Sequence, residues 1–392
     1  MPRVLRIINR FNLGGPTYNA AYLTKYLAPD YKTLLIGGMK DETEDSSEFI
    51  VENLGIRPII IPEMRREINP RNDIIAYQKL KHIIKRFKPD IVHTHASKAG
   101  TLGRLAAYNS GVPVILHTFH GHVFHSYFAS YKSKAFKSIE QGLARRSTKI
   151  IAISDIQKYE LSEIYHIAPA EKIEVIPLGF DLDRFQIDVQ IKRVAFRKKY
   201  KIEDNEIAVG IIGRLVPIKN HQLFLEAIKN VKEKTDKKIR AFIVGDGESR
   251  AFIEQKASDL GLDFSTNGKI ASLTFTSWIK EVDEVYAGLD IVALTSLNEG
   301  TPVSLIEAQA SNKPIVTTNT GGIENIVQPG KTALLADNGD VQDFSEKLLR
   351  LVNDDAFRLE MSNRGWDFVK DKFHYSRLAE DMKNLYNRLL SR

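Results

Sequence analysis

Short apolar segments rich in β-branched residues alternate with helical patterns along the whole chain, and this alternation limits the possible folds more than any other feature. Such alternation is typical of βα units, in which each crossover helix returns the chain to a parallel sheet. Two series of expected strands are separated by a charged helical stretch near residues 180–200. The strands of the first series are 4–8, 33–37, 58–62, 90–95, 113–118, 149–154 and 173–178. Those of the second series are 207–213, 240–245, 273–278, 290–296, 314–319 and 333–337. The sequence therefore predicts an α/β protein with two open sheets.

The length of the chain agrees with two domains. At 392 residues it exceeds the roughly 100–200 residues of a typical domain. We expect an N-terminal domain over residues 1–185, a C-terminal domain over 186–372 and a C-terminal helix over 373–392. The last segment repeats its apolar residues at helical spacing, at Leu378, Met382, Leu385 and Leu389.

Composition excludes several classes of protein. Because the chain has no cysteine, neither a disulfide framework nor a thiolate metal site is possible, which fits a reducing compartment. The first ten residues lack the long apolar region of a signal peptide, and no stretch approaches the roughly 20 apolar residues of a membrane-spanning helix. We expect a soluble, cytoplasmic protein.

The net charge of +7 is unevenly distributed, with roughly +11 in residues 1–150 and about −4 in the remainder. Two interpretations stay open for the basic helices: a solvated helix face, or a surface for anionic membranes at the inner face of the cell membrane. No recognition motif accompanies the charge, so we expect no nucleic-acid partner. The basic residues gather at Lys79, Lys81, Lys85, Arg86 and Lys88, and again at Lys132, Lys134, Lys137, Arg145 and Arg146.

Residues that follow the strands carry the functional prediction, because ligands of parallel sheets bind beyond the carboxyl ends of the strands. In the first series, strand 4–8 leads to a Gly14-Gly15 turn, which is either a tight turn or a close backbone approach to an anion. His95 ends one strand and His120 follows the next. Histidines at this edge can donate to a sugar hydroxyl or to a developing charge.

In the second series, a cationic loop and a pair of glutamates follow two strands. Arg214 and Lys219 come after strand 207–213, and together they suit a diphosphate. Glu299 and Glu307 flank the start of a helix expected near Pro302, and their carboxylates can accept hydrogen bonds from sugar hydroxyls. Paired acids also suit a glycosidase, although a glycosidase does not require phosphate-binding loops.

A metal site is not expected. The Asp181-Leu182-Asp183 segment matches the DxD pattern that holds a metal in other transferases, but it lies in the interdomain turn without companion ligands. The phosphate loop of Walker type is also absent. We expect no cofactor, and a nucleotide sugar would be a substrate.

Several motifs together resemble a known family. The segments GRLVPIKN, GDGESR and NEGTPVSLIEAQASNKPIVTTNTGGIENIV are similar to the C-terminal domain of the retaining family 4 glycosyltransferases, whose E-x7-E motif matches Glu299 and Glu307. VHTHASKAGTLGRLAA and HTFHGHVF resemble the N-terminal domain of members that build bacterial surface polysaccharides. The resemblance covers nearly the whole chain.

The resemblance implies a role for each matching residue. Arg214 and Lys219 would bind the donor diphosphate, Glu307 the ribose and Glu299 the transferred sugar. His120 would contact that sugar near the reacting centre, so that His120, Glu299, Arg214 and Lys219 form the expected catalytic set. The remaining donor-side residues are Gly15, Gly213, Trp278, Ile279, Val303 and Ser304, and the acceptor-side residues are His95 and Lys98. The chain departs from the family at Ser277 and Pro302, where many members have glycine.

The resemblance also implies a fold and a reaction. The expected fold is GT-B, in which two Rossmann-like domains face a central cleft and the C-terminal helix packs back on the N-terminal, acceptor-binding domain. The implied reaction is a metal-independent, retaining transfer of a hexose or N-acetylhexosamine from a nucleoside diphosphate sugar, with UDP favoured, to a glycan or lipid-linked acceptor. A sugar-nucleotide epimerase and a non-catalytic sugar-nucleotide-binding subunit are the alternatives.

Overall fold

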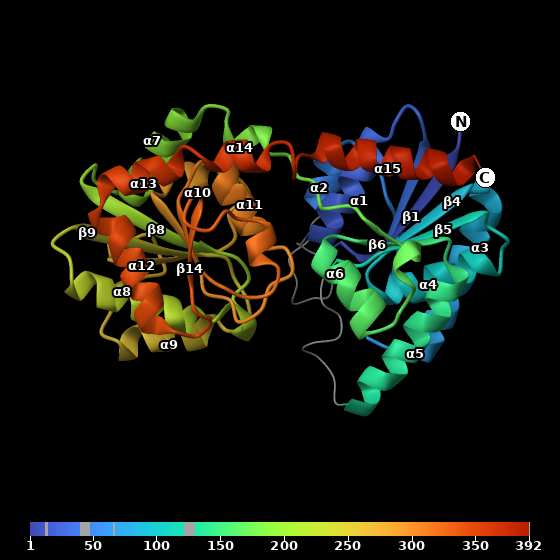
Figure 1. Cartoon of the computed structure of the whole chain (residues 1–392), viewed down its shortest axis with the longest axis horizontal. Helices are drawn as coiled ribbons and strands as arrows, with labels where there is room; N and C mark the ends of the chain where they lie inside the picture. Colours follow the sequence, from blue (N-terminus) through green and yellow to red (C-terminus); the bar gives the residue numbers. More distant parts are fainter. Residues whose placement is uncertain (12–14, 40–47, 66, 121–129, 392) are drawn as a thin grey trace. The chain divides into compact units, whose positions relative to one another are not determined.

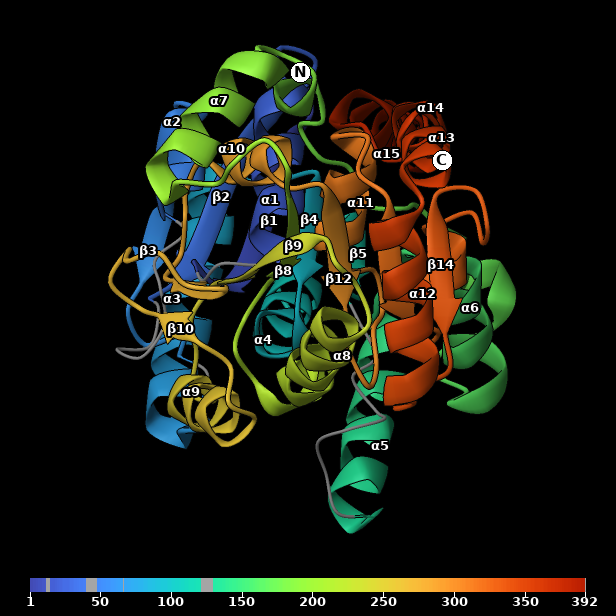
Figure 2. The same cartoon turned by 90° about the vertical axis from the view of Figure 1, so that its left-hand side faces the viewer.

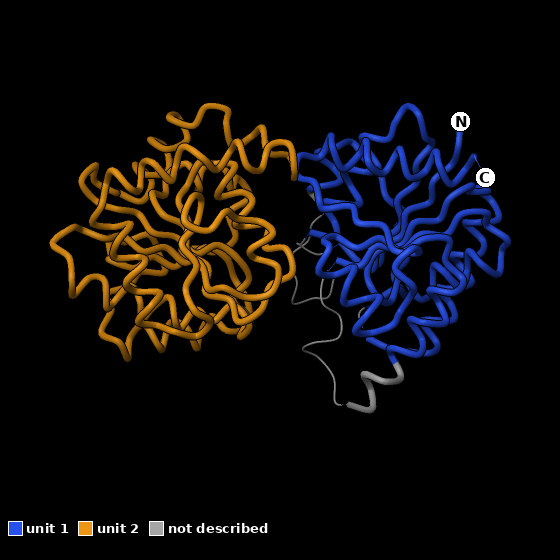
Figure 3. Tube along the Cα trace, viewed as in Figure 1, with its two compact units in different colours: residues 1–180, 373–392 blue, residues 181–372 orange. Residues whose placement is uncertain are grey.

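The chain forms two compact units in a computed structural model that describes residues 1–11, 15–39, 48–65, 67–120 and 130–391. One unit comprises Met1–Phe180 together with Phe373–Arg392, and the other comprises Asp181–Lys372 (Figure 3).

The first unit is built on a parallel sheet that has seven strands among the described residues, in the order β3-β2-β1-β4-β5-β6-β7 (Figure 1). Its strands are β1 (Arg3–Arg10), β2 (Lys32–Gly38), β3 (Ile59–Ile61), β4 (Ile91–His95), β5 (Val114–Thr118), β6 (Lys149–Ala152) and β7 (Ile173–Val175). Its α-helices are α1 (Gly15–Tyr26), α2 (Glu48–Asn53), α3 (Pro70–Phe87), α4 (Ser97–Tyr108), α5 (Ser130–Arg146), α6 (Asp155–Tyr159) and α15 (Tyr375–Leu390). A π-helical turn, η1 (Glu160–Ile164), and a 3-10 turn, η2 (Ala170–Lys172), complete it.

Strand alternation divides the core of the first unit between two faces of the sheet. Leu5 and Val92 belong to a cluster with residues of α3 and α4, whereas Val4 and Ile91 belong to a cluster with residues of α1 and α15. Both faces are therefore covered by helices, as parallel sheets require.

Helix α15 packs on the first unit although it follows the second unit in the sequence. Its buried face comprises Leu378, Met382, Leu385, Tyr386 and Leu389, the helical stripe expected from the sequence with one tyrosine added. The prediction that the C-terminal helix packs back on the N-terminal domain is confirmed.

The second unit repeats the architecture, with a parallel sheet in the order β10-β11-β9-β8-β12-β13-β14 among its residues (Figure 2). Its strands are β8 (Glu206–Ile212), β9 (Lys238–Val244), β10 (Phe264–Ser265), β11 (Leu273–Thr276), β12 (Ile291–Leu294), β13 (Ile315–Thr318) and β14 (Ala333–Ala336). Its α-helices are α7 (Val189–Tyr200), α8 (His221–Glu233), α9 (Arg250–Asp259), α10 (Val282–Gly288), α11 (Val303–Ala310), α12 (Val341–Asn353), α13 (Asp355–Ser362) and α14 (Gly365–Val369). Short 3-10 turns are η3 (Asp183–Phe185), η4 (Pro217–Lys219) and η5 (Ile323–Asn325).

Alternation again separates two faces in the second unit. Ala241 and Ile243 of β9 pack with α8, α9 and α12 in one large core cluster. Phe242 lies on the opposite face, where its ring contacts Phe196 of α7 with ring centroids 5.5 Å apart. The two sheets confirm the predicted α/β class.

The structure divides the chain after Phe180, whereas the sequence predicts a boundary after residue 185. The intervening turn belongs to the second unit because Arg184 forms an ion pair with Asp283 of α10. The described residues include no helix that combines the length and the apolar composition of a membrane span.

Candidate active site

The expected donor-side residues of the second unit lie in loops that follow the carboxyl ends of β8, β11 and β12, and on helix α11, which follows the loop after β12. The loops after β8 and β12 are tied together by two hydrogen bonds. The Leu297 amide donates to the Ile218 carbonyl at 2.9 Å, and the Thr295 hydroxyl donates to the Lys219 carbonyl at 2.9 Å. These bonds fix the cationic loop beside the loop that carries Glu299.

Lys219 and Glu299 contact each other directly. The ammonium group of Lys219 bonds to Oε1 of Glu299, and the Ser296 hydroxyl donates to the same oxygen at 2.6 Å. Both charged side chains are mostly buried, with 21% and 11% of their surfaces exposed. The sequence predicts that the two residues bind different parts of the donor, and it does not reveal their mutual ion pair.

The Gly321-Gly322 turn after β13 presses against the Glu299 loop. The Gly322 amide donates to the Glu299 carbonyl at 2.9 Å, and a Cβ on Gly321 would lie only 2.0 Å from that oxygen. Gly321 also has a φ of +54°, which residues with a side chain rarely adopt. Glycine is therefore required here to hold the Glu299 loop.

Helix α11 carries Glu307 and offers its first-turn amides. Pro302 precedes the helix, so Val303 and Ser304 supply its first N–H groups, which face no intrahelical acceptor. Glu307 is partly buried next to Tyr286 of α10. Burial raises the pKa of Glu307 to about 7, while the Tyr286 hydroxyl and Arg184 act in the opposite direction. Glu307 thus changes its charge near neutral pH.

A network of charged side chains near Glu307 is not visible in the sequence. The Asp283 carboxylate binds Lys192 at 2.9 Å and also Arg184, whose positive charge lowers the pKa of Glu307. The Tyr286 hydroxyl donates to the Ser304 carbonyl at 2.9 Å and so links α10 to α11. Arg184 follows the Asp181-Leu182-Asp183 segment, but no sequence signal singled out Asp283 or Tyr286.

The glycines after β8 and β9 lie against each other next to Trp278. A Cβ on Gly245 would lie 2.0 Å from the Gly213 carbonyl oxygen and 3.6 Å from the Trp278 ring. Gly213 and Trp278, both expected in the donor site, therefore lie on the same side of the strand edge. Ile279 follows Trp278 and is partly exposed.

Ser277, one of the two departures from the resembled family pattern, has a specific partner in the structure. Its hydroxyl donates to Oδ2 of Asp246 at 3.2 Å, and Arg250 donates to the same carboxylate oxygen at 3.0 Å. The serine thus joins the ion pair within the GDGESR segment.

Arg214 is the exposed cation of this group. Its guanidinium has no hydrogen-bonding partner among the described residues, in contrast to Lys219. Arg214 is therefore available to an anion without first breaking a contact.

The first unit carries its own row of histidines near the carboxyl ends of β4 and β5. His95 Nδ1 lies 2.8 Å from His120 Nε2, and the rings stack with centroids 5.1 Å apart. His93 stacks on the other side of His95 at 4.3 Å. The sequence motifs indicate His95 and His120 but not His93, although His93 lies two residues before His95 and therefore on the same face of β4.

Burial keeps these rings neutral. It lowers the pKa of His120 to about 3 and holds the pKa values of His93 and His95 well below their usual range. Burial likewise lowers the pKa of His117 well below its usual range. The Nδ1 of His117 lies 2.9 Å from the hydroxyl of Thr94, which alternates with His93 and His95 along β4.

The AGTLGR segment of α4 serves packing. A Cβ on Gly100 would lie 2.5 Å from the His117 ring, so the glycine lets α4 approach β5. Arg104 forms a fully buried ion pair with Glu140 of α5 at 2.6 Å. Lys98, expected on the acceptor side, pairs with Asp73 of α3 at 2.6 Å.

Part of the predicted site lies outside the described residues. Gly15 begins α1, but the preceding turn at 12–14, which includes Gly14, is not described, and the HTFHGHVF motif is described only as far as His120. The described parts of the chain hold no group of three or more His, Asp or Glu side chains arranged to bind a metal. The individual roles of the site residues stay predictions.

Two family models match the chain. The model described as Glycosyltransferase Family 4 matches residues 13–184, and the model described as Glycosyl transferases group 1 matches residues 192–367. An Escherichia coli UDP-Gal:alpha-D-GlcNAc-diphosphoundecaprenol alpha-1,3-galactosyltransferase is 30% identical over 333 residues, which cover 84% of each protein. The Staphylococcus aureus capsular polysaccharide biosynthesis glycosyltransferase CapM is 25% identical and covers 84% of this chain and 85% of its own.

The fold is similar to that of solved structures. Anabaena Alr3699/HepE in complex with UDP aligns with a TM-score of 0.79 at 18% identity, over 98% of this chain and all of the other. A likeness at this identity shows the fold alone.

Proposed function

Because the chain belongs to the family 4 glycosyltransferases, which have the GT-B fold, we propose that it transfers a hexose or N-acetylhexosamine from a UDP-sugar to a lipid-linked sugar with retention of configuration. The observation that carries the proposal is the joint position of Arg214, Lys219, Glu299 and the start of α11 on the loops at one strand edge of the second unit. The E. coli relative uses UDP-galactose and a diphosphoundecaprenol-linked acceptor, so these are the first substrates to test.

The donor diphosphate is the ligand that best fits this edge. Arg214 and Lys219 supply two positive charges, and the Val303 and Ser304 amides supply donors at a helix N-terminus. When the bond between the sugar and the diphosphate breaks, these groups stabilise the charge that develops on the leaving diphosphate. We propose that no metal ion is required for this stabilisation.

The two glutamates hold the remaining parts of the donor. Glu307 lies on α11 and accepts hydrogen bonds from the ribose hydroxyls when it is ionised, whereas Glu299 accepts them from the transferred sugar. A diphosphate competes with Glu299 for Lys219, so donor binding releases Glu299 oxygens for sugar hydroxyls. The proposed front-face route uses the leaving diphosphate to accept the proton of the acceptor hydroxyl.

His120 contacts the transferred sugar in the loaded enzyme. Since burial keeps the imidazole neutral, His120 acts as a hydrogen-bonding group near the reacting carbon and carries no positive charge. His95 orients it, and Lys98 remains a proposed acceptor contact that must first leave Asp73.

The function is tested by measuring UDP release and sugar transfer together. UDP-hexoses and UDP-N-acetylhexosamines are first screened for protection against thermal unfolding, because a bound donor raises stability by mass action. The stabilising donor is then incubated with and without undecaprenyl diphosphate-linked N-acetylglucosamine. We expect UDP release only with acceptor. Conversion of the UDP-sugar to its epimer without acceptor would establish the epimerase instead.

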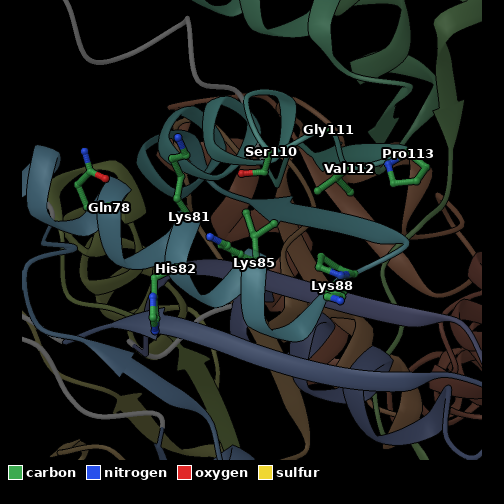
Figure 4. A pocket seen from close by; sticks show the side chains of 11 residues that line it. Gln78, Lys81, His82, Lys85, Lys88, Ser110, Gly111, Val112 and Pro113 are labelled. Atoms are coloured by element: carbon green, nitrogen blue, oxygen red, sulfur yellow. The ribbon is translucent and has the colours of Figure 1, made fainter.

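A lipid-linked acceptor requires contact with a membrane, and we propose that the basic end of α3 provides it. Lys81, Lys85 and Lys88 line a hollow of about 610 Å³ that also includes Ser110 and no acidic side chain (Figure 4). None of the three ammonium groups has an acidic partner among the described residues, which suits the phosphates of anionic lipids.

Liposome flotation tests this membrane contact. The wild-type protein should float with vesicles that contain phosphatidylglycerol and not with pure phosphatidylcholine. Replacing Lys81, Lys85 and Lys88 by glutamine should abolish flotation, whereas the same replacement of the exposed Lys198, Lys199 and Lys232 should not. Equal flotation of both triple variants would place the contact elsewhere.

A further inference from the structure

Arg214 lies in the loop after β8, where the pairing of β8 with β9 ends. The last bond of this pairing is donated by the Gly213 amide to the final carbonyl of β9 at 3.0 Å. Beyond it, Leu215 forms two bonds with the loop after β9. Its amide donates to the Asp246 carbonyl at 2.9 Å, and its carbonyl accepts from the Ser249 amide at 2.9 Å. The backbone on both sides of Arg214 is therefore held by β9 and the loop that follows it.

The loop after β9 has little stiffness of its own, because Asp246 stands between two glycines. Close contact requires both of them. A Cβ on Gly245 would lie 2.0 Å from the Gly213 carbonyl oxygen, and a Cβ on Gly247 would lie 2.5 Å from the Leu215 carbonyl oxygen. Because glycine has more backbone freedom than any other residue, the position of this loop depends on what holds Asp246.

The Asp246 carboxylate has contacts with its own turn, with a helix and with a third loop. Its Oδ1 accepts from the Gly247 amide at 2.9 Å. Its Oδ2 accepts from Arg250 of α9 at 3.0 Å and from the hydroxyl of Ser277, after β11, at 3.2 Å. Arg250 is itself held by Glu254, one turn further along α9, at 2.8 Å. The carboxylate therefore fixes the loop after β9 to its surroundings on two sides.

We infer that Asp246 is a positioning residue that holds the backbone of Arg214 in place for the donor diphosphate. The Arg214 side chain is exposed, so its position before a ligand binds depends on its backbone. A guanidinium binds a diphosphate through directed N–H groups, and this geometry requires a well-placed backbone. Ser277 contributes to the same arrangement through its bond to Asp246.

Hydrogen exchange of the Leu215 amide tests the coupling of the loops without any ligand. Asp246→Ala removes every contact of the carboxylate described above, so exchange at Leu215 should become at least about tenfold faster than in the wild type. Unchanged exchange in Asp246→Ala would overturn the inference.

Asp263→Ala is the matched control for this measurement. The Asp263 carboxylate also accepts from a backbone amide, that of Ser272 at 3.3 Å. It lies before β10, at the amino ends of the parallel strands, whereas Arg214 follows the carboxyl end of β8. This variant should leave both the exchange at Leu215 and the affinity for UDP unchanged.

Calorimetric titration with UDP tests whether the coupling acts on the donor site. Asp246→Ala should bind UDP about tenfold more weakly than the wild type, the effect of losing about one charge-assisted hydrogen bond. Asp246→Asn fills the same space and keeps an acceptor for the Gly247 amide, so it should lose only about threefold. This milder variant keeps the test decisive if Asp246→Ala does not fold. Wild-type UDP affinity in both variants would overturn the inference.

A double-mutant cycle separates positioning of Arg214 from a general loss of stability. Arg214→Gln removes the guanidinium, so adding Asp246→Asn to it should weaken UDP binding by less than about twofold further. Additive losses would overturn the inference, because Asp246 would then act on UDP independently of Arg214.

The contact of Arg214 with the diphosphate rests on the proposed function, whereas the coupling of the loops does not. If exchange at Leu215 increases as expected but the wild type neither binds UDP nor consumes a UDP-sugar, the proposed function fails and the coupling stands. If the wild type transfers sugar but exchange and UDP affinity do not change in the Asp246 variants, the inference fails alone.

Discussion

Lys219 and Glu299 form a mostly buried ion pair across two loops of the second unit. Because Ser296 also donates to Glu299, the carboxylate has two partners before any donor arrives. A bound diphosphate would draw Lys219 away and free Glu299 for the sugar. Before the donor binds, the charges of Lys219 and Glu299 therefore compensate each other.

Replacing Lys219 by alanine should lower kcat/KM about a hundredfold, because the leaving diphosphate loses a positioned cation. The variant also leaves the Glu299 carboxylate partly buried without its ion pair, so UDP should bind more weakly. Steady-state kinetics and calorimetric titration with UDP measure both effects. Lys234→Ala, at an exposed position near the end of α8, should behave like the wild type, and wild-type turnover in Lys219→Ala would exclude the assigned role.

UDP affinity should depend on the ionisation of Glu307, whose folded pKa is raised to about 7. Below this pH the carboxyl is protonated and accepts the ribose hydroxyls poorly, so affinity should fall as pH decreases from about 8 to about 6, by up to about tenfold per pH unit below the pKa. The glutamine in Glu307→Gln cannot ionise. This variant should bind UDP more weakly than the wild type, and its UDP affinity should lack the pH dependence caused by Glu307.

Calorimetry of both proteins across this pH range isolates the effect of Glu307, since any titration of UDP itself is common to the two. Parallel pH profiles for wild type and Glu307→Gln would show that Glu307 does not contact the ribose.

Replacing Gly321 by alanine should disturb the turn for two reasons. The added methyl group would collide with the Glu299 loop, and the backbone conformation would be strained. Gly321→Ala would place Cβ 2.0 Å from the Glu299 carbonyl oxygen, whereas Gly330, with a φ of +72°, has open space around it. Gly330→Ala should cost about 1 kcal/mol of stability and retain activity.

Gly321→Ala should displace the Glu299 loop and reduce kcat/KM at least tenfold beyond the Gly330→Ala control. Thermal melts separate global destabilisation from loss of the site. Equal activities of the two variants would mean that the close approach is not needed.

The buried histidines should make the protein sensitive to acid. Burial lowers the folded pKa values of His93, His95 and His117, so the unfolded chain binds more protons below pH about 6.5, and stability is lost as pH falls from there. Glu307 acts in the opposite sense because its folded pKa is raised.

His117→Gln removes one of these groups. Between pH about 6 and 5, the free energy of unfolding should fall less steeply with pH in this variant than in the wild type. The two slopes should differ by roughly 1.4 kcal/mol per pH unit. Urea unfolding at several pH values measures the slopes, and identical slopes would show that His117 is not kept neutral by the fold.

The order of the elements was predictable because each strand has a continuous apolar run bounded by turn residues. The thirteen strands expected from the sequence all occur, with ends that shift by a few residues. Strand β10 was missed because Phe264–Ser265 is too short to show a periodic pattern. The boundary near residue 180 shifted because the contact of Arg184 with Asp283 is not visible in the sequence.

The site was predictable where residues follow strands and less so where it depends on packing. The position of Arg214, Lys219 and Glu299 at one edge was predictable because parallel strands bring their carboxyl ends together, and their roles stay predictions. Tyr286 and Asp283 shape the environment of Glu307 from a neighbouring helix, and no motif marks them. His93 was passed over because its partners, Tyr386 and Thr118, come from distant parts of the chain.

The central claim, retaining transfer from a UDP-sugar, is tested most directly by ¹H NMR of the product. The stabilising UDP-α-sugar is incubated with undecaprenyl diphosphate-linked N-acetylglucosamine, and the anomeric coupling of the new linkage is measured. The account predicts an α-linked product that forms with the release of UDP and is absent with Lys219→Ala. A β-linked product, or consumption of the donor by epimerisation alone, would contradict it.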